Sequence, residues 1–415
     1  MIEIKKLGCG VRLCSEKIEN ARMVSLGIWV GTGSAYEKPE IAGISHFIEH
    51  MFFKGTQKRS YEQLARELDD LGVSYNAATG KEATLYYFKS LTDTFPKALE
   101  ILLDQFTASV FPEEELTKER GVILEEMAMY EDAPDDHIFD VLDELVFAGT
   151  DLAAPVIGNR KSLASIGRSD ILAYIKSNYA KENIVISVCG EYDEDLLIGM
   201  LNSTLGGFAE KAPGRMGGEL AAGARYACES KDINQSHIAF AIPGLNLQSK
   251  NYYAQLVVSD VLGGGMSSRL FQNVREKRGL CYSVYSSVQA YKDFGQFYIY
   301  GGVCLGKEKE FVKAVESELC DMASSGISEE QLAACKCRLK AAAIFGEERI
   351  ENRMRKNGKN LLILGRCYEE EDIISEIEEI SVKDVEGLMQ SFGHLADYSS
   401  ACISKKKINI ENLIG

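Results

Sequence analysis

Apolar and polar residues recur with two different periods along the chain, which predicts both strands and helices. The opening segment MIEIKKLGCGVRL alternates with a period of two, and the run from Met23 to Val30 is mostly apolar, so both indicate strands. Residues 43–53, 61–71 and 95–109 carry apolar residues three and four positions apart, as amphipathic helices do. Gly72 follows the second of these in the usual place of a helix C-terminal cap.

The same order of elements then occurs twice. In the first half, the segment VSYNAATGKEATLYYFKSL predicts two strands around a turn at Thr79-Gly80, and further helices precede a buried strand from Asn183 to Cys189. The second half repeats strand, helices, paired strands and helices, with expected elements at HIAFAIPG, 252–262, 268–278, 282–288, 294–303 and 398–404. This repetition predicts an α+β protein with two similar domains, each a mostly antiparallel sheet covered by helices.

A Gly- and Ala-rich stretch separates the two halves. It reads GGFAEKAPGRMGGELAAG and has few large apolar residues, so it is typical of a linker. A chain of 415 residues is also too long for one ordinary hydrophobic core. We therefore expect a first domain at 1–207, a linker at 208–224 and a second domain at 225–415.

Composition excludes several classes of function. The formal net charge of −16 leaves no basic surface for nucleic acid, although an acidic surface could attract basic peptides. No run reaches the roughly 18 apolar residues of a membrane span, and the first residues lack the apolar centre of a signal peptide. The 11 cysteines are odd in number and scattered, which indicates reduced thiols. A cytoplasmic protein that binds neither nucleic acid nor membrane is the expectation.

The sharpest local feature is the pentapeptide HFIEH, from His46 to His50. The chain has only 5 histidines, and these two lie four residues apart, so on a helix both imidazoles face one ion. Glu49 lies on the same side and could take a proton from a zinc-bound water, whose pKa zinc lowers to about 7. The order H-x-x-E-H is the established inverzincin signature. The alternative is a helix that merely carries two exposed histidines.

A zinc hydrolase also needs a third protein ligand. In the acidic helix expected at 112–131, Glu119 and Glu126 are two turns apart and face one way, whereas Glu125 lies about 100° round the helix from Glu126. Spacing alone does not choose between Glu125 and Glu126. The alignment with Glu119 favours Glu126 as the ligand and Glu119 as a second carboxylate near the metal or its histidines. Without the histidines, this helix would suit a solvated acidic face.

Several motifs together resemble one family. They are HFIEHMFFKGT, the segment KERGVILEEM that places Glu126 76 residues after His50, SYNAATGKEATLYYF, YEDAPDD and GGGMSSRLFQNVREKRGLCYSVYS. The chain resembles the pitrilysin, insulinase and mitochondrial processing peptidase family of inverzincin zinc metallopeptidases over nearly its whole length. It looks like the compact two-domain bacterial members, which work as paired subunits.

The resemblance implies roles for residues in the first half. His46, His50 and Glu126 would hold one zinc ion per chain, with Glu49 as the general base. Glu119 matches the family's additional glutamate, seven residues before the third ligand. Each of these roles agrees with the spacing of the residues themselves.

The resemblance also implies a substrate-binding surface. Asn76 and Ala77 match the edge strand to which an extended peptide would add through backbone hydrogen bonds, although an ordinary interior strand is the alternative. Arg275 and Tyr282 match an arginine–tyrosine pair near the scissile carbonyl, where a tyrosine hydroxyl can stabilise an oxyanion. Without the family, these two would be one charge among several and one strand aromatic.

The predicted function is a zinc-dependent endopeptidase that hydrolyses peptides or small unfolded segments. Because this chain carries both the zinc motif and the arginine–tyrosine pair, we expect a homodimer in which Arg275 and Tyr282 of one copy complete the site of the other. The alternative is a peptide-binding or processing subunit that needs a partner for activity. His137, His237 and His394 have no ligand-like neighbours in sequence and are expected to be structural or exposed.

Overall fold

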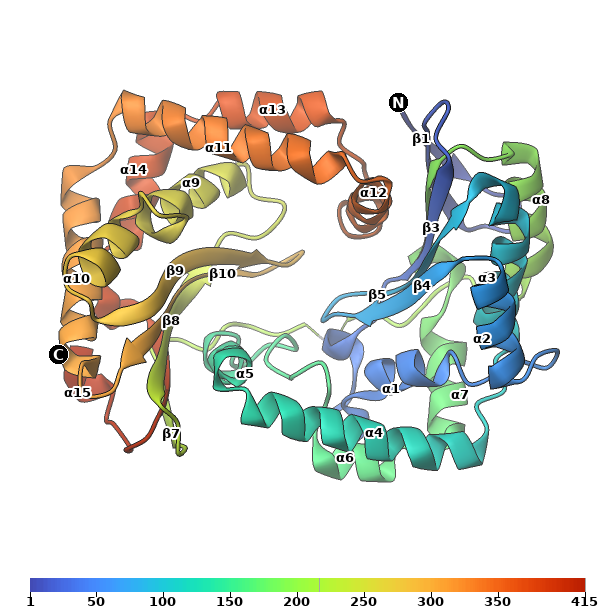
Figure 1. Cartoon of the computed structure of the whole chain (residues 1–415), viewed down its shortest axis with the longest axis horizontal. Helices are drawn as coiled ribbons and strands as arrows, with labels where there is room; N and C mark the ends of the chain where they lie inside the picture. The colour runs from blue at the N-terminus through green and yellow to red at the C-terminus, as the bar shows by residue number, and fades with distance from the viewer. Residues whose placement is uncertain (216, 415) are drawn as a thin grey trace. The chain divides into compact units, whose positions relative to one another are not determined.

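The computed structural model describes residues 1–215 and 217–414, which form two compact units. Unit 1 comprises Met1–Met127, Ala154–Gly217 and Ile344–Glu369, and unit 2 comprises Ala128–Ala153, Gly218–Ala343 and Glu370–Gly415. Met216, in the expected linker, and Gly415, in the expected second domain, lie outside the described residues. Each unit is built on one sheet (Figure 1).

The sheet of unit 1 has strand order β1-β2-β6-β3-β5-β4. All neighbours run antiparallel except β2 and β6, which are parallel. The strands are β1 (Ile2–Lys6), β2 (Arg12–Lys17), β3 (Met23–Val30), β4 (Ser74–Thr79), β5 (Thr84–Leu91) and β6 (Ile184–Gly190). The apolar run that predicted a strand from Met23 to Val30 coincides with β3.

The sheet of unit 2 has strand order β7-β11-β8-β10-β9. Only β7 and β11 are parallel. The strands are β7 (Tyr226–Ser230), β8 (Gln235–Gly244), β9 (Cys281–Ala290), β10 (Gly295–Cys304) and β11 (Ser399–Ser404). Strand for strand and direction for direction, this sheet repeats β2-β6-β3-β5-β4. The prediction of two similar, mostly antiparallel sheets covered by helices is therefore confirmed.

The helices also repeat in the two halves of the chain. The first half has α1 (Ile44–Met51), α2 (Tyr61–Asp70), α3 (Phe95–Ala108), α4 (Glu113–Asp132), α5 (Pro134–Val146), α6 (Arg160–Ser165), α7 (Arg168–Asn178) and α8 (Glu194–Thr204). The second has α9 (Tyr252–Gly263), a π-helical turn (Phe271–Glu276), α10 (Glu308–Ser325), α11 (Glu329–Glu347), α12 (Ile350–Leu364), α13 (Glu370–Glu378), α14 (Val382–Ser391) and α15 (Glu411–Ile414). None of these helices is long and apolar enough to cross a membrane.

Each half of the chain contributes one helix to the other unit. Helix α12 packs on β2, β3 and β6 of unit 1, where Met354 and Leu361 join Trp29, Leu85 and Val185 in a buried cluster. In the reciprocal arrangement, α5 packs on β8 and β11 of unit 2. The expected domain ranges, which are contiguous, stay a prediction, and this exchange of helices is a feature that the sequence pattern did not indicate.

Close approach of α12 to its sheet depends on a glycine. A Cβ atom at Gly358 would lie 2.1 Å from Nε1 of Trp29 and 2.9 Å from Cβ of Ser187. Real side chains do not tolerate such distances, so any larger residue would push the helix away from the sheet. The opposite face of the same sheet packs against a larger apolar core that includes Phe47, Ile48 and Met51 of α1.

Candidate metal centre

Helix α1 is fixed in place by its apolar side and by its first turn. Ile44, Phe47, Ile48 and Met51 recur at helical spacing and are buried. The carboxylate of Glu37 accepts hydrogen bonds from the backbone N–H groups of Gly43 (2.5 Å) and Ser45 (2.7 Å). Burial raises the pKa of Glu37, and these hydrogen bonds oppose that rise. A carboxylate thus caps the helix N-terminus, where both unpaired N–H groups and the helix dipole favour negative charge.

The other side of α1 carries the two histidines of the pentapeptide HFIEH, and both face helix α4. Nε2 of His50 lies 3.3 Å from Oε2 of Glu126, and Nε2 of His46 lies 3.8 Å from the same oxygen. Among the described residues, these three form the one group of histidine, cysteine or acidic side chains whose ligand atoms lie within 4.8 Å of one another. Figure 1 shows α1 lying alongside α4.

The donor set fits zinc. Ligand atoms in a tetrahedral zinc site lie about 3.3 Å apart when each is near 2 Å from the ion. The two histidine–glutamate separations of 3.3 and 3.8 Å are close to this value, and all three ligand atoms lie within 4.8 Å of one another. Two imidazoles and one carboxylate form a ligand set known for catalytic zinc, and they leave a fourth position open. Burial, together with the neighbouring His50, lowers the pKa of His46 to about 4. His46 is therefore neutral near pH 7, as a metal ligand must be.

The structure distinguishes the glutamates of α4 that spacing alone left open. Glu125 is exposed, whereas Glu126 is half-buried and faces both histidines. Glu119 does not belong to the ligand group but contacts one of its histidines. Its Oε2 lies 3.1 Å from Nδ1 of His50, and its Oε1 lies 2.5 Å from Nζ of Lys54. The geometry thus gives Glu119 a position against the second nitrogen of a ligand histidine, which orients the ring.

Glu49 lies on the histidine side of α1, outside the group of ligand atoms. Its carboxylate accepts hydrogen bonds from the hydroxyl and the backbone N–H of Thr79, at the end of β4. Burial raises the pKa of Glu49, and the hydrogen bonds from Thr79 offset part of that rise. A carboxylate that is held in place and made more basic by burial is suited to accept a proton.

Strand β4, which carries Asn76 and Ala77, is the last strand of its sheet. Within the part of the chain that the structure describes, its only strand partner is β5, so β4 is an edge strand and not an interior one. Because Gly80 donates its N–H to the carbonyl of Ala83, the alternation of an antiparallel ladder turns the N–H and C=O of Ala77 and Thr79 toward the free edge. In this structure, Oδ1 of Asn76 accepts a hydrogen bond of 2.8 Å from the backbone N–H of Ala77.

Arg275 and Tyr282 belong to unit 2, where they lie next to each other. Arg275 is in the π-helical turn and Tyr282 is near the start of β9. The guanidinium carbon of Arg275 lies 5.5 Å from the centre of the Tyr282 ring and 4.5 Å from that of Phe271. The Tyr282 side chain is 77% exposed, unusual for a tyrosine. Its hydroxyl is therefore accessible to a ligand.

Three residues of the site were not anticipated from the sequence. Lys54 follows His50 by four residues, so helical spacing could have placed it on the same face. Thr79, which the sequence predicts in a turn, is the last residue of β4, and nothing in its sequence context indicates that it would reach Glu49. Glu37 precedes the helix by several residues, and only the fold brings its carboxylate to the first turn.

The remaining histidines lie elsewhere. Nε2 of His137 lies 3.1 Å from Glu229, Nδ1 of the buried His237 lies 2.8 Å from the Tyr300 hydroxyl, and His394 is exposed. Among the described residues, none of them joins a group that could hold a metal.

A pair of topologically matched units, one of which carries two histidines and a glutamate in zinc-like geometry, defines a two-domain class of metallopeptidases. Sequence comparison agrees: residues 12–160 match Insulinase (Peptidase family M16), and residues 165–339 match the Peptidase M16 inactive domain. The chain belongs to peptidase family M16, the insulinase family.

Relatives of similar length exist in several bacteria. The uncharacterized zinc protease YmxG of Bacillus subtilis (strain 168) is 37% identical over 403 residues, which cover 97% of this chain and 98% of that protein. An uncharacterized zinc protease of Rickettsia felis is 33% identical over 389 residues, or 92% of each chain. These relatives, like the ligand geometry, indicate a zinc-dependent protease.

Solved structures share the fold. A protease from Helicobacter pylori superposes with a TM-score of 0.90 at 19% identity, over 97% of this chain and 99% of that one. A peptidase M16 inactive domain from Pseudomonas fluorescens gives a TM-score of 0.90 at 18% identity, over 98% of each chain. At these identities the likeness concerns the fold alone.

Proposed function

We propose that this protein is a zinc endopeptidase that cleaves extended peptides or small unfolded segments, with one zinc ion per chain. The observation that carries the proposal is the place of Glu49: it is beside the ligand group, is not part of it, and is hydrogen-bonded to the edge strand. The candidate ligands, the candidate base and the free edge of β4 are thus next to one another within unit 1, which supports the proposal.

The ligand residues would hold the ion through the two imidazoles of His46 and His50 and the carboxylate of Glu126. Bound zinc supplies Lewis-acid chemistry, which makes water more acidic and a peptide carbonyl more electrophilic. Glu49 then accepts the proton of the attacking water and returns it to the nitrogen of the departing amine. Thr79 keeps the carboxylate in line for both transfers, because its hydroxyl and N–H bind the same acid.

The free edge of β4 explains how the substrate would be presented. A peptide that adds as another strand would pair with the outward N–H and C=O of Ala77. For that, the side chain of Asn76 must give up the Ala77 N–H, so peptide binding exchanges one hydrogen bond for another. Recognition through the backbone is largely independent of sequence, which suits an enzyme that acts on unfolded segments.

Digestion of a mixed peptide library, followed by mass spectrometry, tests the proposal. Wild type should cleave internal bonds, a chelator should stop cleavage, and Glu49→Gln should bind zinc while losing about 10²–10⁴-fold in kcat, the usual contribution of a general base. Equal rates for wild type and Glu49→Gln would refute the proposed role. Binding of peptides without cleavage would favour a non-catalytic subunit.

We further propose a homodimer in which Arg275 and Tyr282 of one copy complete the zinc site of the other, with the tyrosine hydroxyl at the carbonyl oxygen. The support is that both sets of residues are present in one chain and that Tyr282 is exposed. Mixing inactive Glu49→Gln with inactive Tyr282→Phe would then restore about a quarter of wild-type activity, because half the dimers are mixed and each has one intact site. No recovery would contradict completion in trans. A cytoplasmic location also stays a proposal.

A further inference from the structure

Lys54 extends the line of metal-site residues beyond the end of α1. His46, His50 and Lys54 are spaced four residues apart, and they face Glu126 and Glu119, which are two turns apart on α4. The contacts alternate between the two sides: His46 and His50 with Glu126, His50 and Lys54 with Glu119. The outer end of this arrangement is a lysine, which cannot serve as a zinc ligand while it is protonated.

The ion pair at this end is short and shielded. Nζ of Lys54 lies 2.5 Å from Oε1 of Glu119, and their side chains are 18% and 9% exposed. The other oxygen of Glu119 lies 3.1 Å from Nδ1 of His50. Both carboxylate oxygens of Glu119 are therefore engaged, one by the lysine and one by the histidine ring. Loss of one member of a shielded pair leaves the other charge without compensation, which is costly.

We propose that Lys54 is a positioning residue of the metal centre, which holds Glu119 so that it orients His50. The inference rests on the proposed zinc peptidase function. With Oε1 held by Lys54, Oε2 accepts the Nδ1–H of His50. The lone pair of that ring is then on Nε2, which lies 3.3 Å from Oε2 of Glu126 and would bind the metal. Lys54 thereby gives two similar glutamates different roles. Glu126 is left to bind the metal, whereas Glu119 is held by the lysine and does not compete for the metal.

The pairing of charges supports this assignment. The Lys54 ammonium lies against one oxygen of Glu119, and the His50 ring lies against the other. Without Lys54, Oε1 of Glu119 would lack its cation. A carboxylate released in this way is free to turn toward the ion, which disturbs the three-ligand geometry.

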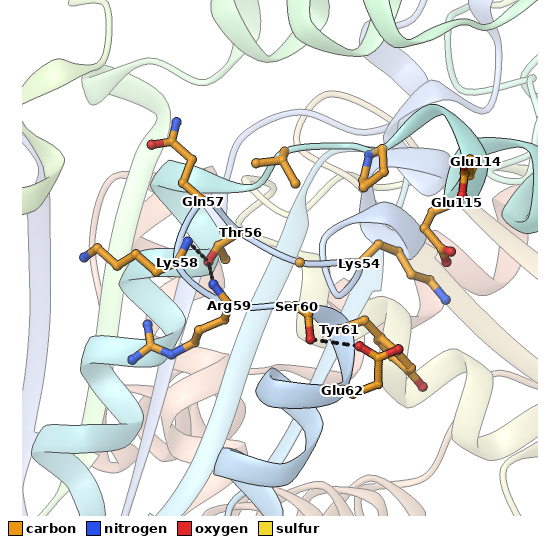
Figure 2. A pocket seen from close by; sticks show the side chains of 13 residues that line it. Lys54, Thr56, Gln57, Lys58, Arg59, Ser60, Tyr61, Glu62, Glu114 and Glu115 are labelled. Carbon is orange, nitrogen blue, oxygen red and sulfur yellow. Dashed lines mark hydrogen bonds between the residues drawn. The ribbon is translucent and has the colours of Figure 1, made fainter.

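Lys54 also borders a cavity of about 470 Å³ that is lined by residues 54–62 and by Val110, Pro112, Glu114 and Glu115 (Figure 2). On this side its ammonium lies 5.1 Å from the centre of the Tyr61 ring. The open volume gives room for a larger cation, so Lys54→Arg can keep the charge next to Glu119. In the same loop, Lys58 has a side chain that is 72% exposed and lies 3.8 Å from Asp104. Lys58→Met is thus the control for Lys54→Met, because it removes the same charge at a position away from Glu119.

Zinc affinity tests the proposal without any need for activity. The dissociation constant of the full-length protein for zinc is measured by competition with a chromophoric chelator, for wild type, Lys54→Met, Lys54→Arg, Lys58→Met, Glu119→Gln and the double variant Lys54→Met/Glu119→Gln. We expect Lys54→Met to weaken binding 10–100-fold, as loss of such supporting contacts does, and Lys54→Arg to restore most of it. Lys58→Met should bind as wild type does, and Lys54→Met should add nothing to Glu119→Gln.

The outcomes separate this inference from the proposed function. If wild type binds zinc but Lys54→Met binds it equally well, or weakens it only as much as Lys58→Met, the positioning role is wrong. An additive loss in the double variant would also overturn it. Failure of wild type to bind zinc would instead contradict the proposed function. A ¹⁵N NMR spectrum of zinc-loaded wild type gives a check that needs no variant: His50 should bind through Nε2 and carry its proton on Nδ1, and binding through Nδ1 would refute the inference.

Discussion

Units 1 and 2 share a sheet topology but differ in what their matching helices carry. In unit 1, the helix that follows β3 is α1, with one apolar side and one side bearing His46, Glu49 and His50. In unit 2, the helix that follows β8 is α9, whose buried residues include Val257, Val258 and Leu262. Among the described residues, the only group able to hold a metal is in unit 1.

The difference shows that the fold supplies a scaffold and that a few side chains supply the chemistry. The second matching segment, residues 165–339, which is described as an inactive domain, contains β7, β8, β9 and β10 of unit 2. The two edge strands repeat the contrast. Thr79 at the end of β4 binds the proposed base, whereas Tyr282 on β9 presents an exposed hydroxyl beside Arg275. The proposed metal ligands and the proposed carbonyl-binding pair thus fall on different units that share one sheet topology.

Metal removal should give the largest effect and should act on one unit. A chelator is expected to abolish hydrolysis and to lower the free energy of unfolding of unit 1 by about 4 kcal/mol, relative to zinc at a thousandfold excess over its Kd. Hydrogen–deuterium exchange followed by mass spectrometry measures this locally. Peptides from α1 and α4 should lose protection and regain it when zinc returns, while those from α9 stay unchanged. Equal loss in both units would contradict the division.

Tyr282→Phe should give the next largest effect, in the unit without metal ligands. Loss of one hydroxyl that stabilises an oxyanion lowers kcat by about 10²–10³-fold, with zinc affinity unchanged. Steady-state kinetics with a fluorogenic peptide measure the change. Tyr285→Phe, on the same strand, is the matched control and should leave kcat close to wild type. Similar losses in both variants would indicate damage to β9 instead of a role in catalysis.

Gly358→Ala tests whether the packing of α12 on the sheet stabilises unit 1. The added Cβ would lie 2.1 Å from Trp29, so we expect a loss of about 1–3 kcal/mol in the free energy of unfolding. Gly346→Ala is the control, because a Cβ there meets no atom within 4 Å and alanine favours helix. Calorimetry should show a lowered melting temperature for Gly358→Ala only. If Gly346→Ala destabilises as much, packing against Trp29 is not the cause.

The helix caps give the smallest predicted contrast. Glu37→Ala leaves the N–H groups of Gly43 and Ser45 without their acceptor and should cost on the order of 1–2 kcal/mol. Asn251, at the N-cap of α9, makes no side-chain capping bond, so Asn251→Ala should cost only a few tenths of a kcal/mol. Denaturant titration measures both. Equal costs would show that the first turn of α1 needs no special support.

Much of the fold could be predicted from the sequence, because apolar residues recur with clearly different periods in helices and in strands. The strand at Met23–Val30 and the helices at α1 and α4 lie within two residues of their expected positions. The pattern could not show where α12 would pack, because an apolar face does not specify its partner. The pattern also could not predict that β2 and β6 are parallel neighbours, since strand order depends on contacts between distant segments.

The site was predictable in part. His46, Glu49 and His50 lie on one helical turn, so spacing was sufficient to bring them together. Spacing could not choose Glu126 over Glu125, and the choice became clear only when α1 and α4 were seen to face each other. Arg275 and Tyr282 had no local signal beyond their resemblance to a family, and their roles, like those of Asn76 and Ala77, stay predictions until tested.

Because α12 comes from the second half of the chain, unit 1 can be completed only late in protein synthesis. A nascent chain that has reached residue 217 contains the strands of the first sheet and all the proposed zinc ligands, but one face of that sheet stays uncovered. At ribosomal rates, residues 218–369 take about 8–30 s more to appear. Prematurely ended chains would therefore lack a complete unit 1, and proteolytic activity would arise only after the segment that carries α12 has left the ribosome.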